Sequence, residues 1–212
     1  MTSMIMSFTR NDSAAKALDG GTHITQTGAY TGQITQASMG MSDGGAQYLD
    51  IAFKADDGRL CFSRLFLSKK DGSEAFGRRI LDALLVVCNA QKADVCEGKV
   101  YTRDRNAQGG FRVDQGYRLP AVEKHHVGLV FQRENRLYNG KPTYQMNLVT
   151  PFDPVTRKVA KEILNGDTEA KLLDARLKNL KDRDSTGGVA GEQQPPANHP
   201  AVAAPMDDDP PF

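Results

Sequence analysis

The first third of the chain contains three stretches in which apolar and polar residues alternate, as they do in strands with one buried face. Turn-forming residues follow the first two stretches, Ser42-Asp43-Gly44-Gly45 after the first and Asp56-Asp57-Gly58 after the second. The pattern therefore predicts a meander of three antiparallel strands. Their expected ranges are 29–39, 48–54 and 59–67.

The spacing of apolar residues then changes from two to three or four over the range 74–90, in which they recur from Phe76 to Cys88. This spacing predicts a helix that follows the third strand. Asp71 lies three residues before Glu74 and is the residue expected to cap the helix N-terminus.

Alternation returns after this helix and predicts further strands over 95–101, 127–138 and 142–149. The last two are joined across Asn139-Gly140, a dipeptide typical of two-residue hairpin turns. The intervening range 102–124 contains several glycines and no clean alternation, so we expect it to be irregular.

Three strands, one helix and then more strands is the element order of the OB-fold, a five-stranded Greek-key barrel with its helix between strands three and four. Other small barrels and α+β domains share this order and remain alternatives. We expect a mainly β protein with an OB-type domain over 28–152 and an N-terminal arm over 1–27.

Two amphipathic segments follow the last of these strands and predict a C-terminal helical extension over 153–184. The first begins at Asp153-Pro154 and ends at Asn165-Gly166, and the second covers 167–180 and places three leucines on one face. We expect these helices to pack on the barrel or on another subunit.

The end of the chain has a different composition. The range 185–205 is dense in Gly, Pro, Ala and Gln and has no periodicity. Such a segment cannot bury enough apolar surface to offset its chain entropy, so we expect a disordered linker that carries an acidic tip over 206–212.

The formal net charge of +1 conceals an uneven distribution. The last 28 residues contain four of the 26 acids and none of the 27 Lys and Arg residues, which leaves +5 on the body and −4 on the tail. A basic body with an acidic tail is typical of proteins that bind nucleic acid or membrane surfaces and carry a separate interaction segment.

Several classes of protein find no support in the sequence. No apolar run approaches the ~18 residues that a transmembrane helix needs, and the N-terminus lacks a basic leader and an apolar core typical of a secretory signal. The three cysteines form no CxxC pair, so we expect them to be buried and reduced in a cytoplasmic protein. These cysteines are Cys61, Cys88 and Cys96.

Basic and aromatic residues are interleaved over 99–144, which holds nine Lys and Arg residues and six of the fifteen Phe and Tyr residues. Cations neutralise phosphates, and flat rings stack on unpaired bases with ~1–3 kcal/mol per base, so this mixture favours single-stranded nucleic acid. The alternative is an aromatic core beneath an ordinary solvated face. We expect Phe131 and Tyr144 in the core, and Tyr101, Phe111, Tyr117 and Tyr138 on a binding face.

The third strand adds a second indication. Its alternation places Phe62, Arg64 and Phe66 on one side. An Arg between two Phe residues is unfavourable in a sealed core because a buried guanidinium needs a partner, whereas it suits an open face that holds bases. The alternative is that Arg64 pairs with a carboxylate at a helix end. Lys69 and Lys70 would extend the basic track.

Together these patterns define the residues that we expect to contact single-stranded DNA. They are Phe62, Arg64, Phe66, Lys69, Lys70, Tyr101, Arg103, Arg105, Phe111, Arg112, Tyr117, Arg118, Arg133, Arg136, Tyr138 and Lys141.

The last residues of the chain have the chemistry of a short peptide ligand. Three carboxylates can face a basic rim, the terminal ring can fill an apolar pocket, and the α-carboxylate can meet an Arg or Lys. Two prolines stiffen the segment and lower the entropy lost on docking. The expected partner-binding residues are Asp207, Asp208, Asp209, Pro210, Pro211 and Phe212.

This end resembles the acidic C-terminal tip of bacterial single-stranded DNA-binding proteins, which recruits replication, recombination and repair enzymes. The resemblance covers about eight residues and includes the Asp run, Pro211 and the final Phe212, whereas Pro210 stands where an Ile is usual.

The body is more similar to single-stranded DNA-binding proteins encoded in phage replication modules. The similarity spans roughly residues 6–165 and implies a phage or prophage origin. It rests on the segments 28–34 (GAYTGQI), 70–72 (KDG), 127–133 (VGLVFQR) and 144–153 (YQMNLVTPFD).

These observations predict a protein that coats and protects single-stranded DNA and recruits partner enzymes through its tip. No nucleotide-binding or metal-ligand motif is present, so we expect no enzymatic activity, cofactor or metal site. Two alternatives remain: a strand-annealing or recombination-mediator protein, and an adaptor that binds no DNA. A homo-oligomer is compatible with the sequence.

Overall fold

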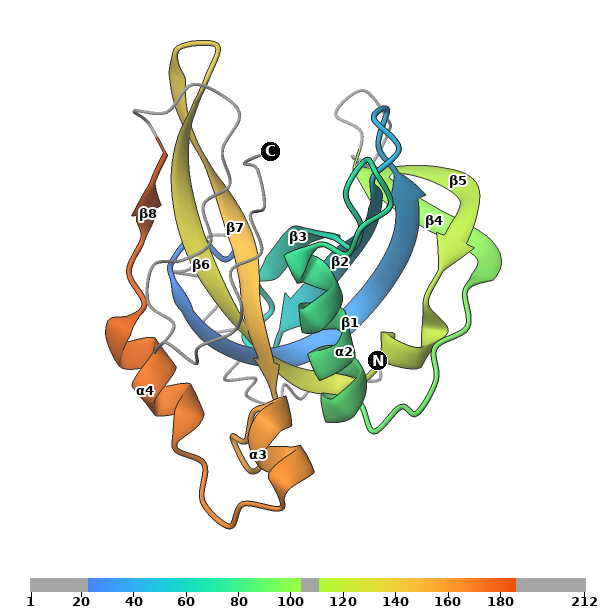
Figure 1. Cartoon of the computed structure of the whole chain (residues 1–212). Coiled ribbons are helices and arrows are strands. Elements are labelled where there is room, and N and C mark those ends of the chain that lie inside the picture. The colour runs from blue at the N-terminus through green and yellow to red at the C-terminus, as the bar shows by residue number, and fades with distance from the viewer. Residues whose placement is uncertain (1–22, 104–110, 186–212) are drawn as a thin grey trace, which may run out of the picture.

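The computed structural model describes residues 23–103 and 111–185, and these form eight strands and a few short helices (Figure 1). The strands are β1 (Gly28–Met41), β2 (Gln47–Ala55), β3 (Leu60–Phe66), β4 (Cys96–Arg103), β5 (Phe111–Arg118), β6 (His126–Tyr138), β7 (Lys141–Phe152) and β8 (Arg183–Asp184). The helices are α2 (Phe76–Val87), α3 (Ala160–Asn165) and α4 (Leu172–Asn179), with a 3-10 turn, η2, at Pro120–Val122.

β1 organises the sheet because it pairs along both of its edges. One edge pairs with β2, which pairs in turn with β3, so the predicted meander is confirmed. The other edge pairs with β6 over Gly28–Gln33 and with β5 at Ser38 and Met39. β6 and β7 form a long hairpin whose turn uses positive φ at Asn139 and Gly140, as predicted.

The sheet is open between β3 and β7. No ladder joins these two strands, although the Leu148 amide donates a hydrogen bond to the Ser63 hydroxyl across the seam at 3.1 Å. The expectation of a mainly β protein is confirmed, whereas closure into a barrel is not. The described sheet has eight strands, compared with the five of an OB-fold barrel.

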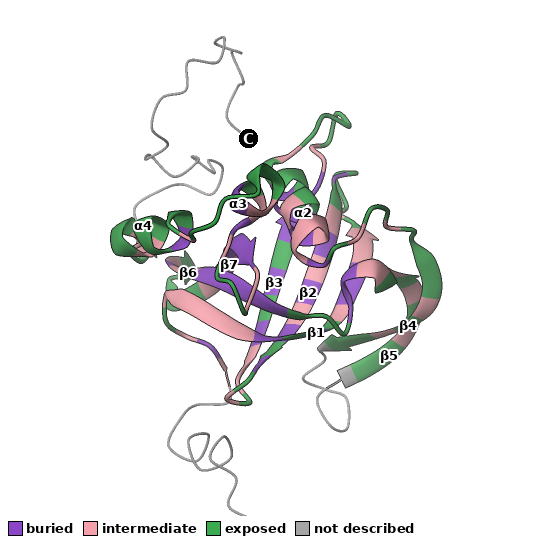
Figure 2. Ribbon diagram, turned by 90° about the horizontal axis from the view of Figure 1, so that it is seen from below, coloured by how far each residue is buried: buried purple, intermediate pink, exposed green. Residues whose placement is uncertain are grey.

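The core lies between the inner face of the sheet and α2. Ile51 and Phe53 of β2 are fully buried, as their alternation predicts, and the Phe53 ring centroid lies 5.7 Å from that of Phe131 on β6. Seen from below, α2 lies across the strands, with buried positions behind it (Figure 2). Ile80 and Leu84 are the residues through which α2 contributes to this core.

The cysteines divide into two environments. Burial raises the pKa of the Cys61 thiol to about 12 and that of Cys88 to about 11, so neither is a nucleophile near neutral pH. Cys96 is exposed at the start of β4, and the expectation that all three are buried is wrong for this residue. No disulfide joins them.

The predicted cap of α2 is wrong. The helix begins after Ala75, whose methyl side chain cannot accept a hydrogen bond from the first turn, and the Ala75 amide donates to the Leu67 carbonyl. Asp71 lies too far upstream and accepts hydrogen bonds from the amide and hydroxyl of Ser73. It therefore stabilises the turn between β3 and α2 rather than the helix.

The expectation that 102–124 is irregular is also wrong. β5 runs antiparallel to β4 and forms with it a two-stranded arm that extends from β1 (Figure 1). Most of the described side chains of β5 are exposed on both faces. No apolar alternation marks such a strand in the sequence.

The C-terminal extension packs on the outside of the β6–β7 hairpin. Leu173 of α4 is buried against Val130, Phe152 and Val159, in a small second core. α3 begins only at Ala160, because Asp153 accepts hydrogen bonds from the amides at 155 and 156 and forms a turn instead of a helix start.

Part of the predicted N-terminal arm belongs to the fold. Ile24 is buried in the main core, and its amide donates to the Leu60 carbonyl at 2.9 Å. The Thr27 hydroxyl accepts from the Arg133 amide at 2.9 Å. This segment therefore joins β3 to β6 near the open seam.

Among the described helices, none is long and apolar enough to cross a membrane.

Two glycines of β1 provide a matched test of how closely β1 packs against β2. A Cβ on Gly32 would lie 2.2 Å from the Lys54 carbonyl oxygen, whereas a Cβ on Gly28 would lie 3.6 Å from its nearest neighbour. We expect Gly32→Ala to lower stability by about 1–3 kcal/mol through overpacking and Gly28→Ala to change it little. Thermal unfolding of both variants checks this, and equal melting temperatures would contradict the described β1–β2 pairing.

Candidate nucleic-acid interface

Three of the predicted contact residues lie on the outer face of β3, opposite the core. Phe62 and Phe66 are 39% and 37% exposed, and Arg64 between them is also exposed. Cys61, with the other alternate residues of β3, is buried. The predicted alternation is therefore confirmed, and it leaves two phenyl rings on an open sheet surface.

The register of β2 against β3 places polar partners beside these rings. Asp50 lies opposite Arg64, and its two carboxylate oxygens accept from Nε and Nη2 of Arg64 at 2.7 Å each. This fork raises the pKa of Arg64 above its ordinary value. The carboxylate partner of Arg64 thus lies on the neighbouring strand and not at a helix end.

Arg64 also stacks on an aromatic ring. Its guanidinium carbon lies 3.7 Å from the centroid of Tyr48, the residue opposite Phe66. A Cβ added to Gly40 of β1 would come within 2.4 Å of the same ring, so Tyr48 lies close against this glycine. The Tyr48 and Phe66 centroids are 6.2 Å apart with an edge-on geometry. Arg64 is therefore held in a fixed, layered arrangement.

The other end of the face has a second ring pair. The His23 and Phe62 centroids are 6.3 Å apart, and His23 forms a bridge to Leu60. We call the surface formed by these groups the aromatic face. Its members are His23, Tyr48, Asp50, Phe62, Arg64 and Phe66.

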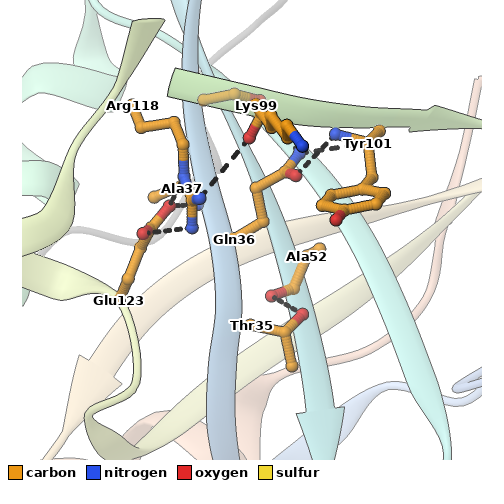
Figure 3. A network of polar contacts seen from close by, with 9 residues as sticks. Thr35, Gln36, Ala37, Ala52, Lys99, Tyr101, Arg118 and Glu123 are labelled. Carbon is orange, nitrogen blue, oxygen red and sulfur yellow. Dashed lines mark hydrogen bonds and ion pairs between the residues drawn. The ribbon is translucent and has the colours of Figure 1, made fainter. Parts of the chain in front are cut away.

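The β4–β5 arm brings Tyr101 beside this face. The side-chain amide of Gln36 accepts from the Tyr101 amide at 2.8 Å and donates to its carbonyl at 3.2 Å (Figure 3). Gln36 lies opposite Ala52, which lies opposite Phe62. Tyr101, 55% exposed, is therefore the end of a row of residues that crosses four strands to Phe62.

The same arm carries three further predicted residues. Tyr117 is 53% exposed, and Arg112 is exposed and paired with Asp114 at 2.8 Å. Arg118 is held at the base of the arm, where its guanidinium binds both carboxylate oxygens of Glu123. Arg118 is therefore an anchor of the arm in this structure.

Lys69 and Lys70 lie in the loop between β3 and α2. The Lys70 side chain lies close to the turn between β1 and β2. A Cβ atom placed on Gly44 in that turn would be only 2.7 Å from Cε of Lys70. Leu67 and Ser68 separate these lysines from Phe66, the last residue of β3. The two cations therefore lie shortly beyond the end of β3.

The β6–β7 hairpin does not join these residues. It rises on the opposite side of β1 from the β4–β5 arm (Figure 1). Arg133 lies over the Tyr144 ring at 4.5 Å, and Arg136 pairs with the buried Glu134 at 3.0 Å. Tyr138 and Lys141 are exposed at the hairpin tip.

Two aromatic residues of this hairpin were expected in the core. Phe131 is fully buried, which confirms that prediction. Tyr144 is 40% exposed, so the prediction is wrong for it. Tyr144 lies opposite Asn135 in the outer half of the hairpin, beyond the reach of the core.

Some predicted residues cannot be placed. Arg105 and the acidic tip at 206–212 lie outside the described residues, as do the predicted linker after Ser185 and most of the N-terminal arm. Arg103 and Phe111 belong to β4 and β5, but their side chains are outside the description.

Four residues of this surface did not emerge from the sequence: His23, Gln36, Tyr48 and Asp50. The three-residue turn at Asp56-Asp57-Gly58 fixes the β2–β3 register, so it could have located Tyr48 opposite Phe66 and Asp50 opposite Arg64. No comparable local signal identifies His23 or Gln36.

A scan against protein-family models and a search of curated proteins gave no match to this chain.

The anchoring role of Arg118 can be separated from DNA contact by a stability measurement. Arg118→Ala leaves the Glu123 carboxylate, whose side chain is 6% exposed, without its cation. We expect a loss of about 1–3 kcal/mol in unfolding free energy, because a buried charged group loses a partner. Arg112→Ala, which removes an exposed pair on the same strand, should cost at most about 1 kcal/mol. Equal effects in urea denaturation would contradict the anchor.

Proposed function

We propose that the protein binds single-stranded DNA on the aromatic face and the adjoining surface of the β4–β5 arm. The observation that carries this proposal is the row of exposed flat groups on β3, Phe62, Arg64 and Phe66, on the side of the sheet away from the core. Phe62 and Phe66 each have one aromatic neighbour, His23 and Tyr48 respectively, and more than a third of each residue stays exposed. Unpaired bases can stack on these exposed rings.

The geometry favours single strands over duplex. In a duplex the faces of the bases are stacked on each other and cannot reach rings on a sheet. An unpaired strand can place its bases on the rings while its phosphates meet nearby cations. Lys54 on the outer side of β2 and Lys99 on β4 are exposed beside this surface and supply such cations.

An OB-type relationship is also part of the proposal. The order of a meander, a helix and a later strand that returns to pair with β1 supports it. The Leu148–Ser63 hydrogen bond and the position of Ile24 support it further, since both lie near the gap that barrel closure would seal. The β4–β5 arm is then an insertion between the helix and the returning strand.

In this proposal the protein coats and protects single strands during DNA replication, recombination and repair in the cytoplasm, and carries out no bond chemistry. The tip at 206–212 recruits partner enzymes. Its support is the sequence of an Asp run, two prolines and a terminal Phe, which suits capture by a basic, apolar pocket.

The first test removes the rings. The double variant Phe62→Ala/Phe66→Ala should lose about tenfold or more in affinity for oligo(dT), because two stacking surfaces disappear. Leu164→Ala, which truncates an exposed apolar side chain on α3, should bind like the unchanged protein. Fluorescence anisotropy at moderate salt measures both, with a duplex of equal length as competitor. A wild-type chain that shows no preference for oligo(dT) over the duplex disproves the proposal.

The second test separates the tip from the body. Deletion of 206–212 should abolish capture of partner enzymes and leave affinity for oligo(dT) unchanged, or slightly higher at low salt, because three carboxylates no longer compete with phosphates. Phe212→Ala retains these carboxylates, so it should lose partner capture without any change in DNA affinity. A strong loss of DNA binding on deletion would mean that the tip contributes directly to the DNA site.

A further inference from the structure

The role of Arg64 follows from how its guanidinium is already engaged. Nε and Nη2 of Arg64 both donate to Asp50. One edge of the guanidinium is therefore occupied, and the Asp50 carboxylate compensates its positive charge. A phosphate that approached this Arg would meet the Asp50 carboxylate at the same place, and like charges so close repel. Arg64 is therefore poorly suited to neutralise a phosphate.

The plane of the same group is available on one side. Tyr48 covers one face of the guanidinium at 3.7 Å, and 44% of the Arg64 side chain remains exposed. Guanidinium planes stack on nucleobases as aromatic rings do. With Asp50 fixing its orientation and Tyr48 supporting it from beneath, the plane is pre-organised, so little side-chain entropy is lost when a base binds.

The neighbours of Arg64 have the same character. Phe62 and Phe66 stand two residues away on either side along β3, which is about 6.6 Å in a strand. All three groups point to the same side of the sheet. We propose that Arg64 is a stacking surface for a nucleobase and not a phosphate contact, and that Asp50 and Tyr48 are its positioning residues. This inference rests on the proposed function.

The test compares two ligands of equal length, oligo(dT) and an abasic oligomer that has phosphates but no bases, over a series of salt concentrations. Arg64→Ala and Arg64→Lys should each weaken oligo(dT) binding about 5- to 100-fold and barely affect the abasic oligomer. The slope of log affinity against log salt should stay unchanged. Lysine should fail to rescue because it retains the charge and lacks the plane.

Lys54→Ala is the matched control, since Lys54 is an exposed cation on the outer side of β2. It should weaken both ligands to a similar degree and reduce the salt slope by about 0.7, the value for one phosphate on a single strand. Melting temperatures should change little in all of these variants, because the Arg64–Asp50 pair is exposed.

Asp50→Asn gives a prediction of opposite sign for the two roles. If Asp50 only restrains a phosphate-binding Arg64, then loss of its charge should raise affinity for both ligands. If Asp50 orients a stacking surface, the variant should bind oligo(dT) less well relative to the abasic oligomer, and this is what we expect.

The outcomes distinguish this inference from the proposed function. A wild-type chain that does not bind oligo(dT) overturns both. A wild-type chain that binds, with an Arg64→Ala variant that loses salt slope and weakens both ligands equally, overturns only the stacking role. Retention of full affinity by Arg64→Lys, or a gain of similar size for oligo(dT) and the abasic oligomer in Asp50→Asn, also overturns it.

Discussion

The buried carboxylate of Glu123 holds the sheet together at the place where two hairpins diverge from β1. It accepts a hydrogen bond from the Ala37 amide at 2.9 Å and binds the guanidinium of Arg118 at the end of β5. Without it, the edge of β1 between β6 and β5 would contain a buried amide with no acceptor. Pairing with Arg118 offsets the desolvation of the carboxylate. One side chain therefore connects β1 to the end of β5.

The shape of the candidate interface depends on this junction. A register shift in β1 between Ile34 and Gln36 bends the strand, and the hairpins leave it in different directions (Figure 1). The β4–β5 arm stays beside the outer face of β2 because Gln36 pairs with the backbone of Tyr101 (Figure 3). The β6–β7 hairpin goes the other way. The aromatic face consequently has the arm as its neighbour and not the long hairpin.

The sequence predicts the fold well wherever a strand has one buried face, because burial forces alternation in β1, β2 and β3. It fails for β5, whose side chains meet solvent on both faces, and for Asp71, whose carboxylate is used by a nearer amide. The placement of Phe62 and Arg64 was predictable for the same reason as the core. The sequence wrongly groups all the Lys and Arg residues of 99–144 into one surface. In the structure most of the described ones lie on two hairpins that diverge from each other.

Because several of the candidate cations are paired with carboxylates, the aromatic face offers flat groups for stacking more than free positive charge. Several cations that the sequence indicates for DNA have a carboxylate beside them: Arg64 has Asp50, Arg112 has Asp114, Arg118 has Glu123 and Arg136 has Glu134. A paired cation attracts a phosphate weakly, since the nearby anion cancels much of its field. In the proposed function, the interface gains selectivity from stacking, which only unpaired bases offer, while the exposed lysines supply a general attraction that duplex and single strands share.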